Sequence, residues 1–286
     1  MFPNYQLEIS GSSYLNQHKH DFVNWNEWGQ ETLLKAQHEN KLVFISIGFA
    51  TCYWCHYMQK DSFKNIFLGF FLNQNFVPIL IDKEQLPEIN QIYMNSIIFE
   101  HGYGGWPLTI IATPTGVPLF LGTTMQQNEL KDILKMFHND WIKNRDSLIH
   151  QSQDWLTRYV NYNNRNVILM NDYVSDLRKW LSKNIDPLMG GFKGVQKFPN
   201  ASRWTQLLDI DSSQIIHAEA LMNSIMTSPL YDVVDGGIHR YSSDKTWSIP
   251  HFEKLLIDQV NFMDLLLTLN DITSEPIYLD IVKDTL

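Results

Sequence analysis

The sequence predicts an α/β domain, a mixed sheet flanked by helices, followed by an all-helical region. Short runs rich in β-forming residues alternate with amphipathic segments through about the first 145 residues, and the strand signal then disappears. The hydrophobic content of 44% and aromatic content of 13% are ample for packed cores in a chain of 286 residues. We therefore expect two domains, 1–145 and 146–286.

The first domain is predicted to begin with an irregular polar lead-in, 1–20. Apolar runs bounded by turn residues predict strands at 42–49, 76–82, 108–113 and 117–122. Apolar residues at helical spacing predict helices at 24–41, 63–71, 88–99 and 128–143. Strands separated by helices favour parallel pairing, and the "PTG" turn between the last two strands predicts a hairpin. This order of elements is that of a thioredoxin-like fold.

Two of these helices are predicted from particular apolar faces. The face of the 24–41 helix consists of Trp25, Trp28, Leu33 and Ala36. The face of the 63–71 helix consists of Phe63, Ile66, Phe67, Phe70 and Phe71. In the second domain, helical patterns occur at 173–184, 205–226, 251–271 and 275–286, with glycine-rich joints between them.

The charge of the chain limits the classes of partner. A net charge of -9 and a pI near 5.5 argue against binding to nucleic acid or to an anionic membrane. The N-terminus has neither the basic start nor the apolar core of a signal peptide, and no apolar run reaches the roughly 18–20 residues of a membrane helix. We expect a cytoplasmic protein, in which a lone C-x-x-C motif is typical of redox or metal chemistry.

Both cysteines of the chain lie in "TCYWCHYM", as Cys52 and Cys55. Three interpretations compete. The pair is a redox dithiol, attaches a c-type haem through C-x-x-C-H, or supplies part of a zinc site together with His56 and a further ligand such as His101. The redox interpretation is favoured, because haem attachment normally needs export and neighbouring Cys55 and His56 project differently from a helix. We expect no metal and no cofactor.

The position of Cys52, where a buried strand gives way to a helix, favours its thiolate. Unpaired backbone N–H groups and the helix dipole stabilise an anion there, so Cys52 is expected to attack. Cys55, one turn later, is expected to resolve the mixed disulfide. Pro107 follows glycines in "GGWPLT" and opens a strand, which favours a cis-proline facing the dithiol. Trp54, Trp106 and Pro107 are the expected substrate-binding residues.

Long segments of the chain resemble the spermatogenesis-associated protein 20 family, which includes bacterial YyaL-type proteins. The matching segments are "SIGFATCYWCHYMQKDSF", "IDKEQLPEINQIYM", "GGWPLTIIATPTGVP", "GGFKGVQKFP" and "LYDVVDGGIHRYSSDKTWSIPHFEKLLIDQ". The resemblance implies a thioredoxin-like domain, with Cys52, Cys55 and Pro107 at its site, followed by an (α/α) toroid similar to six-hairpin glycosidases. It also implies a polar cluster of Asp235, His239, Arg240, His251 and Glu253.

The chain departs from the family pattern in its detail and in its length. Tyr53 stands where the family usually has histidine, and "KEQLPE" and "LGTTMQ" replace other family segments. A toroid of about a dozen helices needs more than the residues after 145, at roughly 11–12 residues per helix plus loops. The resemblance therefore implies a fragment or a shortened gene product. A partial toroid would leave helix faces uncovered, which favours self-association.

The sequence thus predicts a thiol–disulfide oxidoreductase or redox-sensing module acting on client thiols, disulfides or a reductase. A non-enzymatic scaffold is one alternative. Carbohydrate processing by the polar cluster of the helical region is another, since a carboxylate and a histidine converging in a cavity suit proton transfer. Against it, Pro250 followed by Glu253 is also the pattern of an ordinary helix start.

Overall fold

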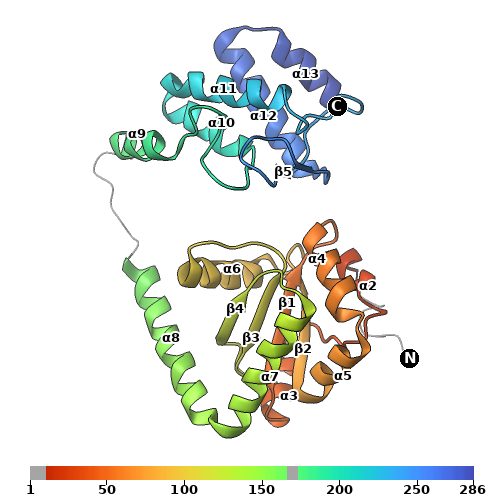
Figure 1. The fold of residues 1–286 in the computed structure, drawn as a ribbon. Helices are drawn as coiled ribbons and strands as arrows, with labels where there is room; N and C mark the ends of the chain where they lie inside the picture. The colour runs from red at the N-terminus through yellow and green to blue at the C-terminus, as the bar shows by residue number, and fades with distance from the viewer. Residues whose placement is uncertain (1–10, 166–172) are drawn as a thin grey trace. The chain divides into compact units, whose positions relative to one another are not determined.

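The computed structural model describes residues 11–165 and 173–286, which belong to two compact units, Met1–Ile168 and Leu169–Leu286 (Figure 1). Residues 146–165, which the sequence assigned to the helical region, lie in the first unit. The part of the predicted lead-in before residue 11 lies outside the described residues.

The first unit alternates helices and strands much as predicted. Its helices are α2 (Ser13–Gln17), α3 (Gln30–His38), α4 (Tyr53–Met58), the π-helical turn η1 (Gln59–Phe63), α5 (Ile66–Asn75), α6 (Pro87–His101), α7 (Gln127–Lys143) and α8 (Arg145–Arg165). Its strands are β1 (Leu42–Gly48), β2 (Phe76–Asp82), β3 (Leu108–Ala112) and β4 (Pro118–Gly122). All four predicted strands are confirmed to within one residue at either end.

The four strands form one mixed sheet in the order β2-β1-β3-β4. β1 and β2 are parallel, with Gly48 opposite Asp82, while β3 is antiparallel to both β1 and β4. The parallel pairing of β1 and β2 and the final hairpin are confirmed. The parallel pairing expected for β3 is wrong, because α6 returns the chain to the opposite edge of β1 in the reverse direction. This mixed arrangement is thioredoxin-like.

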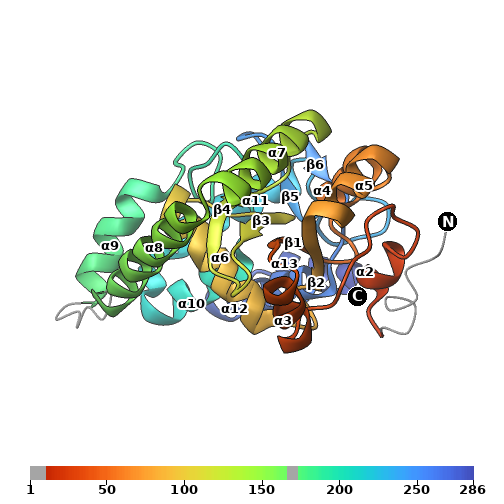
Figure 2. The same ribbon diagram turned by 90° about the horizontal axis from the view of Figure 1, so that it is seen from below.

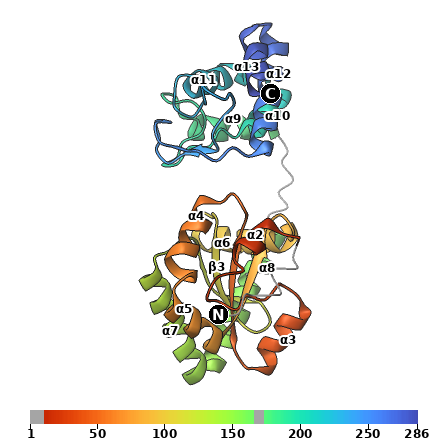
Figure 3. The same cartoon turned by 90° about the vertical axis from the view of Figure 1, so that its right-hand side faces the viewer.

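Helices cover both faces of the sheet, as Figure 3 shows: α4, α5 and α7 lie on one side, and α3 and α8 on the other. The alternation of β1 accounts for the two layers. Val43, Ile45 and Ile47 are buried with Ile97 of α6 and Trp155 of α8. The opposite face of β1 carries Phe44, Ser46 and Gly48. The cysteines therefore follow the central strand of a sheet that is packed on both faces.

The predicted helix 24–41 is wrong in its first part, because α3 begins only at Gln30. Asn26 instead pairs with β2: its N–H donates to the Pro78 carbonyl at 2.9 Å, and its own carbonyl accepts from Leu80 at 3.0 Å. Backbone groups used in this pairing are not available for a helix. The lead-in also contains a helix that was not predicted, α2, whose N-cap Ser12 accepts from the Leu15 N–H.

The buried carboxylate of Asp21 links the lead-in by hydrogen bonds to the helical segment that follows the cysteines. Asp21 is almost fully buried and accepts three side-chain hydrogen bonds. The donors are His18 Nδ1 at 2.6 Å, Trp25 Nε1 at 3.0 Å and Gln59 Nε2 at 2.9 Å. Because every donor is itself buried or nearly so, this carboxylate is a structural centre of the first unit.

The predicted apolar helix face at 63–71 is also wrong. Phe63 ends η1, and Asn65 caps a new helix by accepting from the N–H groups of Phe67 and Leu68. The cap shifts the buried face to Leu68 and Leu72. As a result Phe67 is 80% exposed, and Ile66 and Phe70 are exposed as well.

The second unit is helical, with one two-stranded ladder. Its elements are α9 (Tyr173–Asn184), α10 (Ala201–Ile210), the 3-10 turn η2 (Ser212–Gln214), α11 (Ile215–Met226), β5 (Tyr241–Ser242), β6 (Pro250–His251), α12 (Leu256–Thr273) and α13 (Ile277–Thr285). α12 lies beside both α10 and α13 (Figures 1 and 2). Its core includes the buried residues Trp204, Leu221, Trp247 and Phe262.

Two of the helices predicted here need correction. The helix expected at 205–226 is broken at Asp211, whose carboxylate bonds Arg178, Ser213 and Gln214 rather than leaving the backbone to continue. The helix expected at 251–271 begins only at Leu256, because His251 pairs with Tyr241 in the ladder. The helical character of the region is confirmed, and its likeness to part of a toroid stays a prediction.

Among the described helices, none is both long enough and apolar enough to cross a membrane.

Candidate redox site

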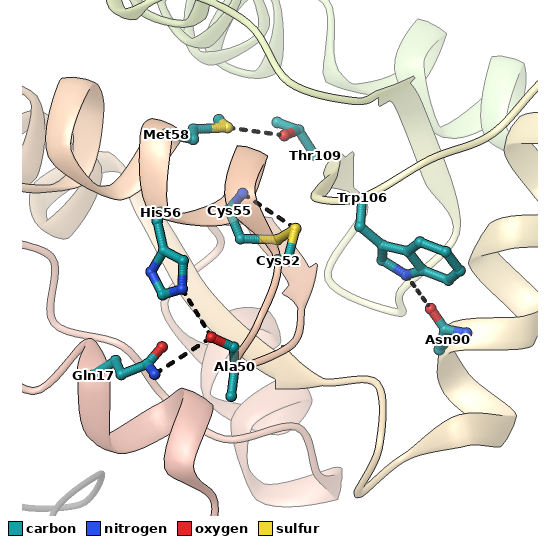
Figure 4. Close-up of a disulfide and its surroundings, with 9 residues drawn as sticks. All are labelled: Gln17, Ala50, Cys52, Cys55, His56, Met58, Asn90, Trp106 and Thr109. Carbon is teal, nitrogen blue, oxygen red and sulfur yellow. Dashed lines mark hydrogen bonds between the residues drawn. A yellow bond between two sulfur atoms is a disulfide. The ribbon is translucent and has the colours of Figure 1, made fainter. Parts of the chain in front are cut away.

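The two cysteines lie at the start of α4, just past the carboxyl end of β1. Cys52 is the N-cap residue, and its sulfur accepts a hydrogen bond from the Cys55 N–H at 3.2 Å. The two residues form a disulfide with a Cα–Cα distance of 5.2 Å (Figure 4). The expected position of Cys52 at a strand-to-helix junction is therefore confirmed. An anion on that sulfur would lie where the helix has unpaired N–H groups.

The sulfurs are covered while the neighbouring aromatic rings are not. Cys52 and Cys55 are each 2% exposed, whereas Tyr53 is 52% and Trp54 37% exposed. Trp54 has edge-to-face contacts with both Tyr53 and Tyr57, at centroid distances of 5.1 and 5.7 Å. The exposed apolar surface at the site thus belongs to the helix that carries the dithiol.

The peptide bond between Trp106 and Pro107, in the loop before β3, is cis as predicted, and the expectation that Pro107 faces the dithiol stays a prediction. Trp106 is held on two sides. Its Nε1 donates to Asn90 Oδ1 at 2.8 Å, and its ring meets Phe49 edge-on at 5.7 Å. The Lys83 ammonium lies 4.5 Å from the Phe49 ring centre and 5.0 Å from that of Trp106. Sequence reasoning missed Lys83, which follows β2 and places a cation beside these rings.

The histidines weighed as metal ligands make hydrogen bonds to carbonyl groups. His56 Nε2 lies 2.8 Å from the Ala50 carbonyl, toward which Gln17 also points (Figure 4). His101 Nε2 lies 3.0 Å from the Leu121 carbonyl, on another part of the sheet. Within residues 11–165 and 173–286 no three His, Cys, Asp or Glu side chains are grouped as a metal site.

A group of buried polar side chains lies beneath the disulfide, and sequence reasoning missed it. A Cβ on Gly48 would collide with the Tyr14 hydroxyl and lie 2.7 Å from the Cys55 sulfur, so Gly48 lets these two groups approach each other. Ser46, two residues earlier on the same face, is fully buried beside the Tyr14 hydroxyl, and no described group is in hydrogen-bonding position to its Oγ. The available signal was a serine inside an otherwise apolar strand.

The negative charges of two carboxylates, Asp21 and Asp82, contribute to a raised pKa of Tyr14. Asp82, opposite Gly48, accepts from Ser12 Oγ at 2.6 Å and from the Glu84 N–H at 3.0 Å. Burial raises the pKa of the Tyr14 phenol well above its ordinary value; Ser46 opposes this shift, and the negative charges of Asp21 and Asp82 add to it. Tyr14 is therefore a protonated hydrogen-bond donor at neutral pH.

The polar residues predicted as a second site are only partly brought together. Arg240 donates its backbone N–H to the Glu253 carbonyl, and His251 Nδ1 lies 3.8 Å from Glu253 Oε2. Asp235 is exposed, and His239 is buried against Phe252. The His251 ring stacks on Tyr241 at 4.2 Å. Burial lowers the pKa of both His239 and His251.

The fold and the cystine at the start of α4 define a thioredoxin-like redox module. The chain belongs to the Thioredox_DsbH family, whose model carries the description "Protein of unknown function, DUF255" and matches residues 4–160. The expected family is confirmed by relatives that extend over nearly the whole chain. The rat and human proteins named Spermatogenesis-associated protein 20 are 32% identical over 302 residues and 30% identical over 296 residues, each covering 96% of this chain.

The match is to part of each relative, since the chain spans 38% of the length of both of these proteins. A solved structure titled "DsbH Oxidoreductase" is 15% identical and covers 39% of this chain and 81% of its own, with a TM-score of 0.32.

Proposed function

We propose that the first unit exchanges disulfides with a client protein or a reductase through Cys52 and Cys55. The observation that carries the proposal is the cystine at the start of α4, with Cys52 as the N-cap residue. The N-terminus of helix α4 stabilises a thiolate on Cys52. Cys52 is therefore both the attacking thiol of the reduced protein and the sulfur that a client attacks in the disulfide. Cys55, on the next turn, resolves the mixed disulfide.

The surroundings of the cystine support a protein client. Trp54 presents a partly exposed ring on the same helix, and the cis Trp106–Pro107 pair opens β3 nearby. Such surfaces suit an extended peptide, whose apolar side chains pack on rings while its backbone meets the loop. Because the sulfurs are almost fully covered, client access requires the surrounding side chains to move.

The test is a redox titration of the full chain in glutathione buffers, with free thiols trapped by alkylation and counted by mass. We expect one intramolecular disulfide with a midpoint in the range of known oxidoreductases, roughly -120 to -270 mV. Cys52→Ser removes the disulfide, and Cys55→Ser accumulates a mixed disulfide on Cys52. If the wild-type chain forms no reversible Cys52–Cys55 disulfide, the proposed function is wrong.

A further inference from the structure

Opening the cystine creates a buried anion on Cys55. When a client thiolate attacks Cys52, the bond between the two protein sulfurs breaks and its electron pair passes to the Cys55 sulfur. Cys55 is 2% exposed, so little water is available to solvate that charge. An uncompensated buried thiolate is costly, and a poorly stabilised leaving group slows the exchange.

The Tyr14 hydroxyl is the side-chain donor that the fold places beside this sulfur. Both groups lie less than 3 Å from the point that a Gly48 Cβ would occupy, so they are less than 6 Å apart. In the cystine, the Cys55 sulfur is neutral and is held toward Cys52. Once the bond opens, rotation about χ1 of Cys55 is released and the sulfur can turn toward the hydroxyl.

We propose that Tyr14 is a catalytic residue of the exchange, donating a hydrogen bond to the Cys55 thiolate. This inference rests on the proposed function. In the first step a client thiolate forms a bond to the Cys52 sulfur and the Cys52–Cys55 bond breaks. Cys55 leaves as a thiolate that accepts a hydrogen bond from the Tyr14 hydroxyl. A second client thiolate then displaces Cys52, and the protons of the two client thiols end on the two protein thiols. The client loses two electrons and the protein gains them; the reverse direction uses the same contact.

Two further observations fit this role. Ser46 is buried beside the Tyr14 hydroxyl and bonds no described group in the cystine form, so its hydroxyl is available to donate to the Tyr14 oxygen once Tyr14 turns its proton to the Cys55 thiolate. Asp82 is already bonded by Ser12 and a backbone N–H, so it does not need Tyr14 as a donor. Tyr14 stays protonated and is therefore suited to donate a hydrogen bond, not to accept a proton.

The experiment compares Tyr14→Phe with Tyr93→Phe in the full chain. Tyr93 is a matched control, because it is also a buried tyrosine, but its hydroxyl donates to the Gly116 carbonyl at 2.8 Å and its ring packs on the other face of the sheet. The first readout is the rate at which dithiothreitol reduces the cystine. Tyr14→Phe is expected to slow it roughly three- to tenfold, and Tyr93→Phe less than twofold.

The second readout is the pKa of the Cys55 thiol in a Cys52→Ser background, from the pH dependence of alkylation. A hydrogen bond to a charged group is worth about 1.5–3 kcal/mol, so Tyr14→Phe should raise that pKa by about one to two units. His56, beside Cys55, and the carboxylates Asp21 and Asp82 around Tyr14 are unchanged in the comparison. The shift therefore reports the hydroxyl alone.

The outcomes separate the two proposals. If the wild-type disulfide forms reversibly but Tyr14→Phe leaves both the rate and the pKa unchanged, the inference is overturned and the proposed function stands. If Tyr14→Phe and Tyr93→Phe slow the reaction equally, the effect is general loosening and the inference is also overturned. Should Tyr14→Phe not fold, Ser46→Ala replaces it, with a change in the same direction of about twofold or more expected, and no change overturning the inference.

Discussion

Replacing Gly48 by alanine should destabilise the oxidised protein more than the reduced one. The new Cβ would collide with the Tyr14 hydroxyl and lie 2.7 Å from both the Cys55 sulfur and the Tyr14 Cζ. Overpacking of this kind costs about 1–3 kcal/mol. Replacing a glycine that has an ordinary φ returns about 0.5–1 kcal/mol through the unfolded chain. The two ranges leave a net loss in the oxidised state of up to about 2.5 kcal/mol.

Reduction should relieve part of this clash, since the Cys55 sulfur is then free to rotate away. The disulfide of Gly48→Ala should consequently be easier to reduce. Each 1.4 kcal/mol of difference between the two states raises the midpoint potential by about 30 mV. The assay is the glutathione titration together with denaturant unfolding of both redox states. Gly11→Ala is the control, because nothing lies within 4 Å of its added Cβ. Equal stability and an unchanged potential in Gly48→Ala would refute the close approach of Tyr14 and Cys55.

Two further predictions concern stability. Asp21→Ala leaves three buried donors without their acceptor and should cost about 3–5 kcal/mol by denaturant unfolding, whereas exposed Asp154→Ala should cost less than about 0.5 kcal/mol. The second concerns pH: burial lowers the pKa of His239 and His251, so the unfolded chain binds protons first as the pH falls below about 6.5. The contribution of these two histidines to the free energy of unfolding is fully present above that pH and should decline below it. The denaturant midpoint of unfolding should therefore be lower at pH 5.5 than at pH 7.5. If the midpoint of His239→Gln declined by the same amount, the effect would belong to other groups.

The strands were predictable because each is a short apolar run with turn residues at both ends. The sequence of β2, "FVPILID", is buried along its whole length and is confirmed residue for residue. Helix bounds were less predictable, because a periodic apolar pattern does not show where the backbone finds other partners. Asn26 pairs with β2 and Asn65 caps α5, and both contacts overrule the local pattern.

Some residues of the candidate site could likewise be predicted from local sequence signals, and others could not. The cystine and the cis-proline have local signals, a C-x-x-C motif after a strand and a proline after glycines. Tyr14 and Asp82 have none, since only the tertiary fold brings Tyr14 close to Gly48 and Cys55 and pairs Asp82 with Gly48. Lys83 is likewise placed at Phe49 and Trp106 by the pairing of β1 with β2.

Ser46 connects the energetics of the fold with the chemistry proposed for it. A buried hydroxyl without a good partner costs about 1–3 kcal/mol, and the remaining residues of β1 show that an apolar side chain suits this strand. Packing in the oxidised state therefore does not explain why this position is a serine. The proposed reduced state does explain it. If Tyr14 turns its proton to the Cys55 thiolate, the Tyr14 oxygen becomes a better hydrogen-bond acceptor, and Ser46 is the donor beside that oxygen. On this argument Ser46→Ala should stabilise the oxidised chain or leave it unchanged while making the disulfide harder to reduce, a combination that a purely structural serine would not produce.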